Sequence, residues 1–194
     1  MERKLRNFSV LSGALADNID FIAAQKAIVN IIIESIERGG IVYICGNGGS
    51  ASQASHMVGE LVGRFRFDRP ALPAVSLFDL ATTTAIGNDY GYDETFSRFI
   101  AGLGKPADVL VSLSTSGNSR NCIRAMEEAS KKDMKTVSFL GRDGGMMKDM
   151  SDAAIVVPSE DTPTIQEIHL MILHDVCDRV EQRFFGNARD ISPL

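Results

Sequence analysis

The stretch from Ile41 to Arg64, IVYICGNGGSASQASHMVGELVGR, decides the fold. It opens with an apolar run of β-branched and aromatic residues, which is typical of a buried strand. The segment Gly46–Gly49 holds three glycines, which supply backbone conformations closed to other residues. After it the apolar residues recur at helical spacing, and Ser50 or Ser52 is the expected helix cap. A strand, a glycine turn and a helix N-terminus together predict an anion site made of free backbone N–H groups.

The rest of the chain alternates strands with helices. Helices are expected at about 8–38 (two helices or one bent helix), 94–102, 119–131 and 162–185, and further strands at 73–78, 108–113, 135–140 and 153–157. Strands and helices that alternate through short turns form a parallel sheet covered on both faces. The predicted fold class is therefore α/β. We expect a single doubly wound domain, 1–194, with a five-stranded parallel sheet flanked by helices and an N-terminal helical segment, 1–38.

Bulk composition narrows the class of protein. The net charge of −5 gives no basic surface of the kind that binds nucleic acid. The sequence contains no run of about 18 apolar residues, so no membrane span is predicted. The three cysteines form no C-x-x-C pair, which favours reduced thiols in a cytoplasmic protein. Ala14–Ala16 resembles a signal-peptidase site, but the apolar patch before it is short and interrupted by polar residues.

A second loop has the composition of a phosphate site. Ser114, Thr115, Ser116 and Ser119 place four hydroxyl groups after a predicted strand and before a predicted helix. Neutral donors and a helix dipole suit a phosphate without a lysine. The alternative is an ordinary serine-rich turn with a side-chain cap. Two such loops at strand ends of one parallel sheet predict a phosphorylated small molecule in the crevice between them.

The first loop also permits other interpretations. Gly46–Ala51 formally satisfies the G-x-G-x-x-A fingerprint of dinucleotide-binding proteins. That interpretation requires an acidic residue about 20 positions further on, and the nearest candidate, Asp79, comes clearly later. A purely structural tight turn is the other alternative.

His56 and Glu60 are four residues apart on one helix face. Such a pair can bind one metal ion or supply an acid and a base to one substrate, although many such pairs only stabilise an exposed helix. The terminal helix carries the other two histidines, His169 and His174, among apolar neighbours. A histidine on such a stripe is usually a satisfied structural residue.

These segments resemble a known family. CGNGGSASQASHMVGE, GNDYGYD, STSGNS and IQEIHLMILH are similar to the sugar isomerase (SIS) domain and, more closely, to the phosphoheptose isomerases. The resemblance runs from about Ile19 to Phe185. It implies an aldose–ketose isomerase that converts sedoheptulose 7-phosphate to D-glycero-D-manno-heptose 7-phosphate through an enediol, for bacterial heptose and surface-polysaccharide biosynthesis such as lipopolysaccharide.

The resemblance also assigns roles to individual residues. The implied catalytic residues are Glu60 and His174. The implied substrate contacts are Asn47, Gly48, Gly49, Glu60, Asn88, Asp89, Ser114, Thr115, Ser116, Ser119 and Gln166. A zinc site, one Zn²⁺ per subunit, is implied at His56, Glu60, Gln166 and His174. The residues alone do not decide whether Glu60 acts as a free base or as a tight metal ligand.

The family further implies a homotetramer with active sites at subunit contacts, and no nucleic-acid or membrane partner. Two alternatives stay open. One is a non-catalytic SIS protein that binds a phosphosugar or a protein partner, like the replication-initiator-associating relative, which lacks the acid and base residues. The other is an isomerase of another phosphosugar, because the phosphate loop does not specify the length of the sugar chain.

Overall fold

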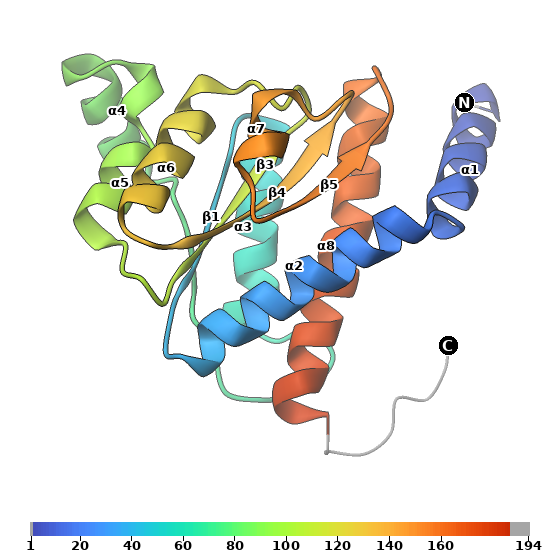
Figure 1. The fold of residues 1–194 in the computed structure, drawn as a ribbon, viewed down its shortest axis with the longest axis horizontal. Coiled ribbons are helices and arrows are strands. Elements are labelled where there is room, and N and C mark those ends of the chain that lie inside the picture. Colours follow the sequence, from blue (N-terminus) through green and yellow to red (C-terminus); the bar gives the residue numbers. More distant parts are fainter. Residues whose placement is uncertain (1, 187–194) are drawn as a thin grey trace.

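The computed structural model describes residues 2–186. Five strands form one parallel sheet in the order β2-β1-β3-β4-β5. The strands are β1 (Val42–Gly46), β2 (Ala74–Ser76), β3 (Val109–Ser114), β4 (Lys135–Gly141) and β5 (Ala153–Val157). The expected doubly wound α/β fold with five parallel strands is therefore confirmed (Figure 1).

Eight α-helices and one short 3₁₀ helix connect the strands within residues 2–186. They are α1 (Glu2–Ala16), α2 (Ile19–Glu37), α3 (Gly49–Val62), α4 (Leu80–Asp89), η1 (Tyr92–Glu94), α5 (Ser97–Leu103), α6 (Arg120–Lys131), α7 (Gly145–Met150) and α8 (Thr162–Phe185). The sequence prediction missed α4 and α7. Asp79 caps α4 by accepting a hydrogen bond from the Thr82 N–H, and within the helix only Ile86 is buried, so no apolar period marks it.

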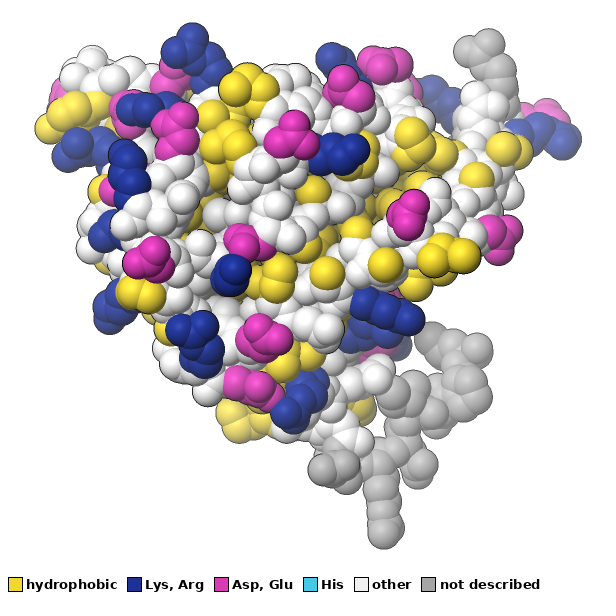
Figure 2. All heavy atoms as spheres, viewed as in Figure 1, with side chains coloured by type: hydrophobic (Ala, Val, Ile, Leu, Met, Phe, Trp, Pro, Cys, Tyr) yellow, Lys and Arg dark blue, Asp and Glu magenta, His cyan; other side chains and the backbone are white. Residues whose placement is uncertain are grey.

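The N-terminal segment consists of two helices, one of the two alternatives that its sequence allowed. The break falls at Asp17–Asn18, where the Asn18 side chain accepts a hydrogen bond from Phe21 N and caps α2. Helix α1 projects from the body of the molecule (Figure 1). Figure 2 shows exposed hydrophobic side chains over α1 and α2 among charged side chains of both signs, and Leu5, Val10 and Ile19 are among the exposed hydrophobic residues.

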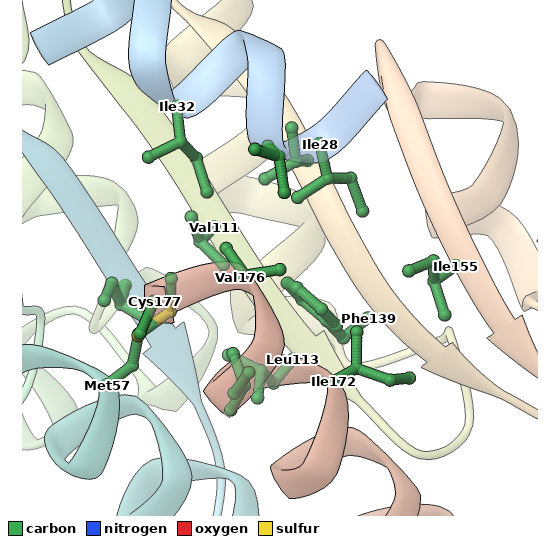
Figure 3. Packing of buried hydrophobic residues seen from close by; sticks show 14 of the residues in the cluster. Ile28, Ile32, Met57, Val111, Leu113, Phe139, Ile155, Ile172, Val176 and Cys177 are labelled. Carbon is green, nitrogen blue, oxygen red and sulfur yellow. The ribbon is translucent and has the colours of Figure 1, made fainter. Parts of the chain in front are cut away.

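Helices cover both faces of the sheet and create two cores. On one face α2, α3 and α8 pack against alternate strand residues such as Val111, Leu113 and Phe139 (Figure 3). On the other face α5, α6 and α7 pack against Tyr43, Leu110 and their neighbours. Because α3 and α8 share one core, side chains on their facing surfaces lie together although they are far apart in sequence.

The strand order creates a switch point next to β1. The chain leaves β1 for β2 on one side and later enters β3 on the other side of β1. At such a point the connections after the two strands run in opposite directions and open a crevice outside their carboxyl ends. The glycine loop follows β1 and the serine loop follows β3, so both loops start at the carboxyl ends of neighbouring parallel strands. No helix within residues 2–186 is long and apolar enough to cross a membrane.

Candidate functional site

The first loop opens α3 without a side-chain cap. Gly48 is the N-cap residue, with φ +55° and ψ −120°, and no side chain accepts a hydrogen bond from the first turn. The prediction that Ser50 or Ser52 caps this helix is therefore wrong, because the helix begins at Gly49, before either serine. The positive φ explains the glycine at position 48. In the first turn, Ser50 N and Ala51 N donate to the carbonyl oxygens of Asn47 and Gly48, both at 3.0 Å, and the anion site at this helix end stays a prediction.

Asn47 is held by two other side chains. Its amide exchanges hydrogen bonds with the amide of Asn121, at 2.8 Å and 2.9 Å, and its Oδ1 also accepts a hydrogen bond from the Tyr92 hydroxyl at 2.7 Å. Asn121 lies in the first turn of α6 and is only 2% exposed. It also donates to Thr95 Oγ1 at 3.3 Å. This arrangement fixes the orientation of the Asn47 amide beside the crevice and links the two loops.

The serine loop forms a hydrogen-bonded cradle ahead of α6. Ser114 Oγ lies 2.8 Å from Ser119 Oγ and 3.4 Å from Ser116 Oγ, and it accepts a hydrogen bond from Gly117 N at 3.1 Å. Ser119 is the N-cap residue of α6, yet no side chain caps the helix. The three serines that were predicted to share a site are therefore brought together, whereas no hydrogen bond of the described residues involves the Thr115 side chain.

Helices α3 and α8 bring together His56, Glu60 and His174. Nε2 of His56 lies 2.9 Å from Nε2 of His174 and 3.0 Å from Oε1 of Glu60. One donor atom from each residue lies within 4.8 Å of the others. Two imidazole nitrogens and one carboxylate oxygen at this spacing suit Zn²⁺, whose bonds to such atoms are about 2.0–2.2 Å long. The donor set therefore fits the metal that the family resemblance implies.

Gln166, the fourth zinc ligand that the resemblance implies, lies near the start of α8, and its role as a ligand stays a prediction. Its side chain lies against the start of α3, where a Cβ atom added at Gly49 would be 2.6 Å from Gln166 Nε2. Its carbonyl oxygen accepts a hydrogen bond from Gln53 Nε2 at 2.6 Å. Gln166 and His174 lie in one continuous helix, and eight residues of straight helix span about 12 Å. The structure thus places Gln166 at the glycine loop, next to a predicted substrate contact.

Two further predicted substrate contacts, Asn88 and Asp89, come from the end of α4. Both are exposed, and they contact each other through a 2.8 Å hydrogen bond. Among residues 2–186, no hydrogen bond or ion pair connects their side chains to the glycine or serine loop. Their roles stay predictions.

His169 is a core residue, as the alternative interpretation of its apolar stripe proposed. It is fully buried, and its Nε2 lies 3.0 Å from the Leu140 carbonyl oxygen. Desolvation lowers the pKa of His169 to about 4, so the ring is neutral at pH 7. Its Nδ1 has no hydrogen-bond partner among the described residues. Cys177, two turns further along α8, is also buried, and burial raises the pKa of its thiol to about 12.

Sequence reasoning missed three residues around the site, namely Asn121, Tyr92 and Phe65. Tyr92 lies within GNDYGYD, a segment that was singled out, but nothing in its spacing shows that its hydroxyl reaches Asn47. The Phe65 ring stacks on His174 with centroids 5.7 Å apart and an interplanar angle of 14°. That contact joins a loop to a helix more than a hundred residues away, so no local pattern could predict it.

Comparison with known proteins identifies the family. Residues 12–141 match the SIS domain. The chain is 51% identical over 162 residues to the phosphoheptose isomerase of Helicobacter pylori, covering 83% of this chain and 84% of the relative. It is 49% identical over 178 residues to the phosphoheptose isomerase of Burkholderia pseudomallei, covering 91% and 90% of the two chains.

Solved structures agree with this assignment. The phosphoheptose isomerase of Neisseria gonorrhoeae superposes with a TM-score of 0.87 at 34% identity, over 93% of this chain and 96% of that chain. The phosphoheptose isomerase of Francisella tularensis gives a TM-score of 0.88 at 34% identity, with the same coverage. The chain therefore belongs to the SIS-domain family and, within it, to the phosphoheptose isomerases.

Proposed function

We propose that this protein converts sedoheptulose 7-phosphate to D-glycero-D-manno-heptose 7-phosphate, with Glu60 as the base and His174 as the group that moves protons between sugar oxygens. The observation that carries the proposal is the convergence of Glu60 and His174 where α3 meets α8, with one ligand atom of each within 4.8 Å of the other. Both residues lie on α3 and α8, whose apolar faces pack in one core, so their relative position is set by packed helices. Enzymes that isomerise sugars in this way need one base for a carbon-bound proton and a route for the oxygen-bound protons.

The reaction assigns a task to each group. Glu60 removes a proton from C1 of the ketose, which gives the enediol, and returns it to C2. His174 accepts the O1 proton and supplies a proton to O2, so that the carbonyl group moves from C2 to C1. The role of Glu60 parallels the glutamate base of triosephosphate isomerase, a known example of this chemistry.

The two loops orient the substrate. Ser114, Ser116 and Ser119, with the N-terminus of α6, bind the 7-phosphate through neutral donors and the helix dipole. Asn47, whose amide is already fixed by Asn121, contacts sugar hydroxyl groups beside the first N–H groups of α3. Fixing both ends of the sugar relative to Glu60 lowers the entropy that the transition state must lose.

His56, Glu60 and His174 are the residues that would hold Zn²⁺, which when bound supplies a Lewis acid for sugar oxygens. Glu60 has two carboxylate oxygens, and Oε1 is the one that faces His56. A chelator tests whether turnover depends on the metal.

We further propose a cytoplasmic homotetramer. The tetramer is supported by the family and by the hydrophobic side chains that α1 and α2 expose, including Leu5, Val10 and Ile19. A cytoplasmic location is supported by the three cysteines, which are all free and buried. Sedimentation of the purified protein tests the tetramer.

Proton NMR of the metal-analysed protein with sedoheptulose 7-phosphate tests the reaction. We expect the aldoheptose 7-phosphate to form, and Glu60→Gln to lower kcat by about 10²–10⁴-fold, the contribution of a general base. Glu127→Gln makes the same chemical change on the surface of α6 and should retain activity. An unchanged ketose with a folded, metal-loaded protein would favour the binding-protein or other-sugar alternative.

A further inference from the structure

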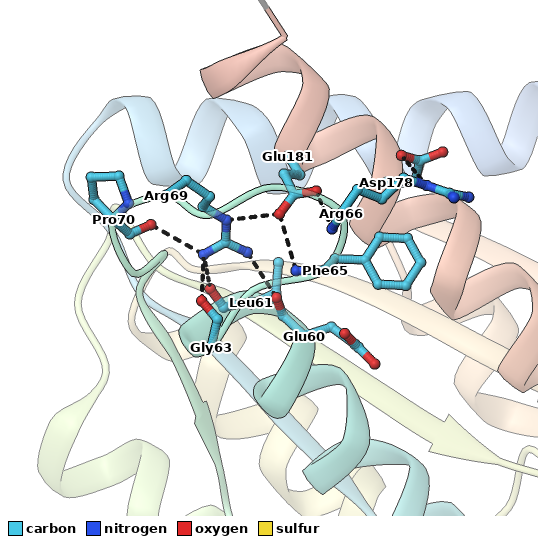
Figure 4. Close-up of polar contacts among 9 residues, drawn as sticks. All are labelled: Glu60, Leu61, Gly63, Phe65, Arg66, Arg69, Pro70, Asp178 and Glu181. Carbon is cyan, nitrogen blue, oxygen red and sulfur yellow. Dashed lines mark hydrogen bonds and ion pairs between the residues drawn. The ribbon is translucent and has the colours of Figure 1, made fainter. Parts of the chain in front are cut away.

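A buried carboxylate on α8 fixes the segment that follows α3. Glu181 is 0% exposed. Its Oε1 accepts a hydrogen bond from Phe65 N at 3.1 Å, and its Oε2 accepts one from Arg66 N at 2.7 Å (Figure 4). Hydrogen bonds from backbone donors to a buried carboxylate are among the stronger ones in proteins. The backbone at Phe65 is thus held directly against α8.

The guanidinium group of Arg69 completes this contact. Its side chain is 1% exposed, and its Nε donates to Glu181 Oε1 at 2.9 Å. Its Nη2 donates to the Glu60 carbonyl oxygen at 2.7 Å, and its Nη1 donates to the Leu61 carbonyl oxygen at 2.6 Å. The last carbonyls of a helix lack partners within the helix, so Arg69 caps the end of α3 at the residue that bears the proposed base. One buried ion pair therefore touches both helices of the site.

This network places the Phe65 ring on His174. The two rings are close to parallel, with an interplanar angle of 14° and centroids 5.7 Å apart. The Arg66 guanidinium carbon lies 5.1 Å from the Phe65 centroid, and Arg66 Nε contacts Asp178 Oδ1 at 3.0 Å. His174, Asp178 and Glu181 are spaced by four and three residues, so α8 presents all three on one face. The same face therefore carries the imidazole, the partner of Arg66 and the anchor of Phe65.

We propose that Phe65 is a positioning residue for His174, and that the buried Glu181–Arg69 pair holds it in place. An imidazole on a half-exposed helix face can rotate about its side-chain bonds. A parallel ring on one side, together with His56 on its Nε2 edge, restricts that rotation and keeps Nε2 directed at Glu60 and His56. The inference rests on the proposed function, because the imidazole must face the sugar oxygens to move their protons.

The test combines kinetics with NMR on Phe65→Leu, which removes the ring but keeps an apolar side chain. We expect kcat to fall about tenfold or more, because a displacement of about 1 Å can cost far more than that. KM should stay within about twofold, since the two loops that bind the substrate are unchanged. Phe99→Leu is the matched control, because Phe99 is also partly buried but packs on the opposite face of the sheet.

The NMR measurement reports on the imidazole independently of turnover. The chain has three histidines, so single substitutions assign their ring resonances. A stacked aromatic ring shields the protons that lie over its face, so Phe65→Leu should move the His174 ring protons downfield and leave those of His169 in place. Glu181→Gln, which weakens the anchor but keeps Phe65, should move the His174 resonances in the same direction.

The outcomes separate this inference from the proposed function. A parent enzyme that turns over sedoheptulose 7-phosphate, with a Phe65→Leu variant whose kcat is no lower than that of Phe99→Leu, overturns the inference alone. If the unsubstituted protein is inactive but the His174 resonances still shift in Phe65→Leu and Glu181→Gln, the proposed function is wrong. The inference that Phe65 positions the His174 ring then still stands. Resonances that do not move in a folded Phe65→Leu protein also overturn the inference.

Discussion

Nε2 of His56 and Nε2 of His174 lie 2.9 Å apart, although 118 residues separate them in the sequence. The contact exists because α3 and α8 pack side by side on one face of the sheet and present one histidine each to the same point. Glu60, one turn beyond His56, lies within reach of the same point. Several measurable properties depend on this convergence and on the contacts around it.

Zn²⁺ is expected to stabilise the folded protein, because its three donors converge only when α3 and α8 are packed together. At a free metal concentration of about 100 times Kd the gain is about 2.7 kcal/mol, which calorimetry detects as a higher unfolding temperature. His174→Gln should lose most of this shift. His169→Gln is the control and should keep it, because His169 faces the core. An equal shift in both variants would contradict the assignment of the three donors.

Removing the Asn121 amide is expected to weaken substrate binding. Asn121→Ala leaves the Asn47 amide without two of its hydrogen bonds, and losses of this kind cost about 1–3 kcal/mol. We expect KM for sedoheptulose 7-phosphate to rise about tenfold. Tyr92→Phe removes only one contact of Asn47 and should have a smaller effect. Asn30→Ala, at an exposed position of α2, serves as the control. If Asn121→Ala and Asn30→Ala have the same KM, the orientation of the Asn47 amide does not contribute to substrate binding.

Breaking the buried ion pair is expected to destabilise the protein strongly. Either Arg69→Met or Glu181→Leu leaves a charge at a site that is 1% or 0% exposed, at a cost of about 3–5 kcal/mol. The double variant should be more stable than the sum of the two single losses predicts, because no unpaired charge remains. It should not recover fully, since backbone groups at Phe65 and Leu61 lose their partners. Denaturant unfolding of the four proteins measures this, and single losses below about 1 kcal/mol would refute it.

Because of His169, the free energy of unfolding is expected to decrease as the pH is lowered. Its pKa is about 4 in the folded protein and 6.5 in the unfolded chain, so between these values only the unfolded chain binds the proton. The free energy of unfolding therefore decreases as pH falls from 6.5 to about 4, by about 3 kcal/mol in total. His169→Gln removes this contribution. Unfolding curves at pH 7 and pH 5 should show a loss about 2 kcal/mol larger in the parent than in the variant. Equal losses would show that the ring is not held neutral.

The long elements and their order could be predicted because their residues carry a strong local pattern. Strand β3 is fully buried and apolar except for Ser112 and Ser114, and α8 begins at an Asp-Thr-Pro sequence and continues for 24 residues. The cap of α8 is Asp161, whose side chain accepts a hydrogen bond from Thr164 N. Short or polar elements escaped prediction. Helix α7 has six residues and follows Gly144 at φ +94°, too little chain for a period to emerge.

Some features of the candidate site could likewise be predicted from local sequence, and others could not. The i, i+4 spacing of His56 and Glu60 set their proximity, and the 3.0 Å contact confirms it. The serine loop likewise follows from residues that are adjacent in the chain. The position of Gln166 against Gly49 depends on how whole helices are placed.

By itself, then, the sequence determined the α/β class, the glycine and serine loops, the histidine–glutamate pair and the family, because each of these resides in nearby residues whose backbone preferences and spacing act locally. Only the tertiary structure decided the strand order, which makes β1 and β3 neighbours, and the packing of α3 on α8 that joins His56 to His174. It also decided the buried Glu181–Arg69 pair that carries Phe65 to the imidazole. These contacts form between segments far apart in the chain, where burial of two faces against a common sheet, rather than any local preference, sets which side chains meet.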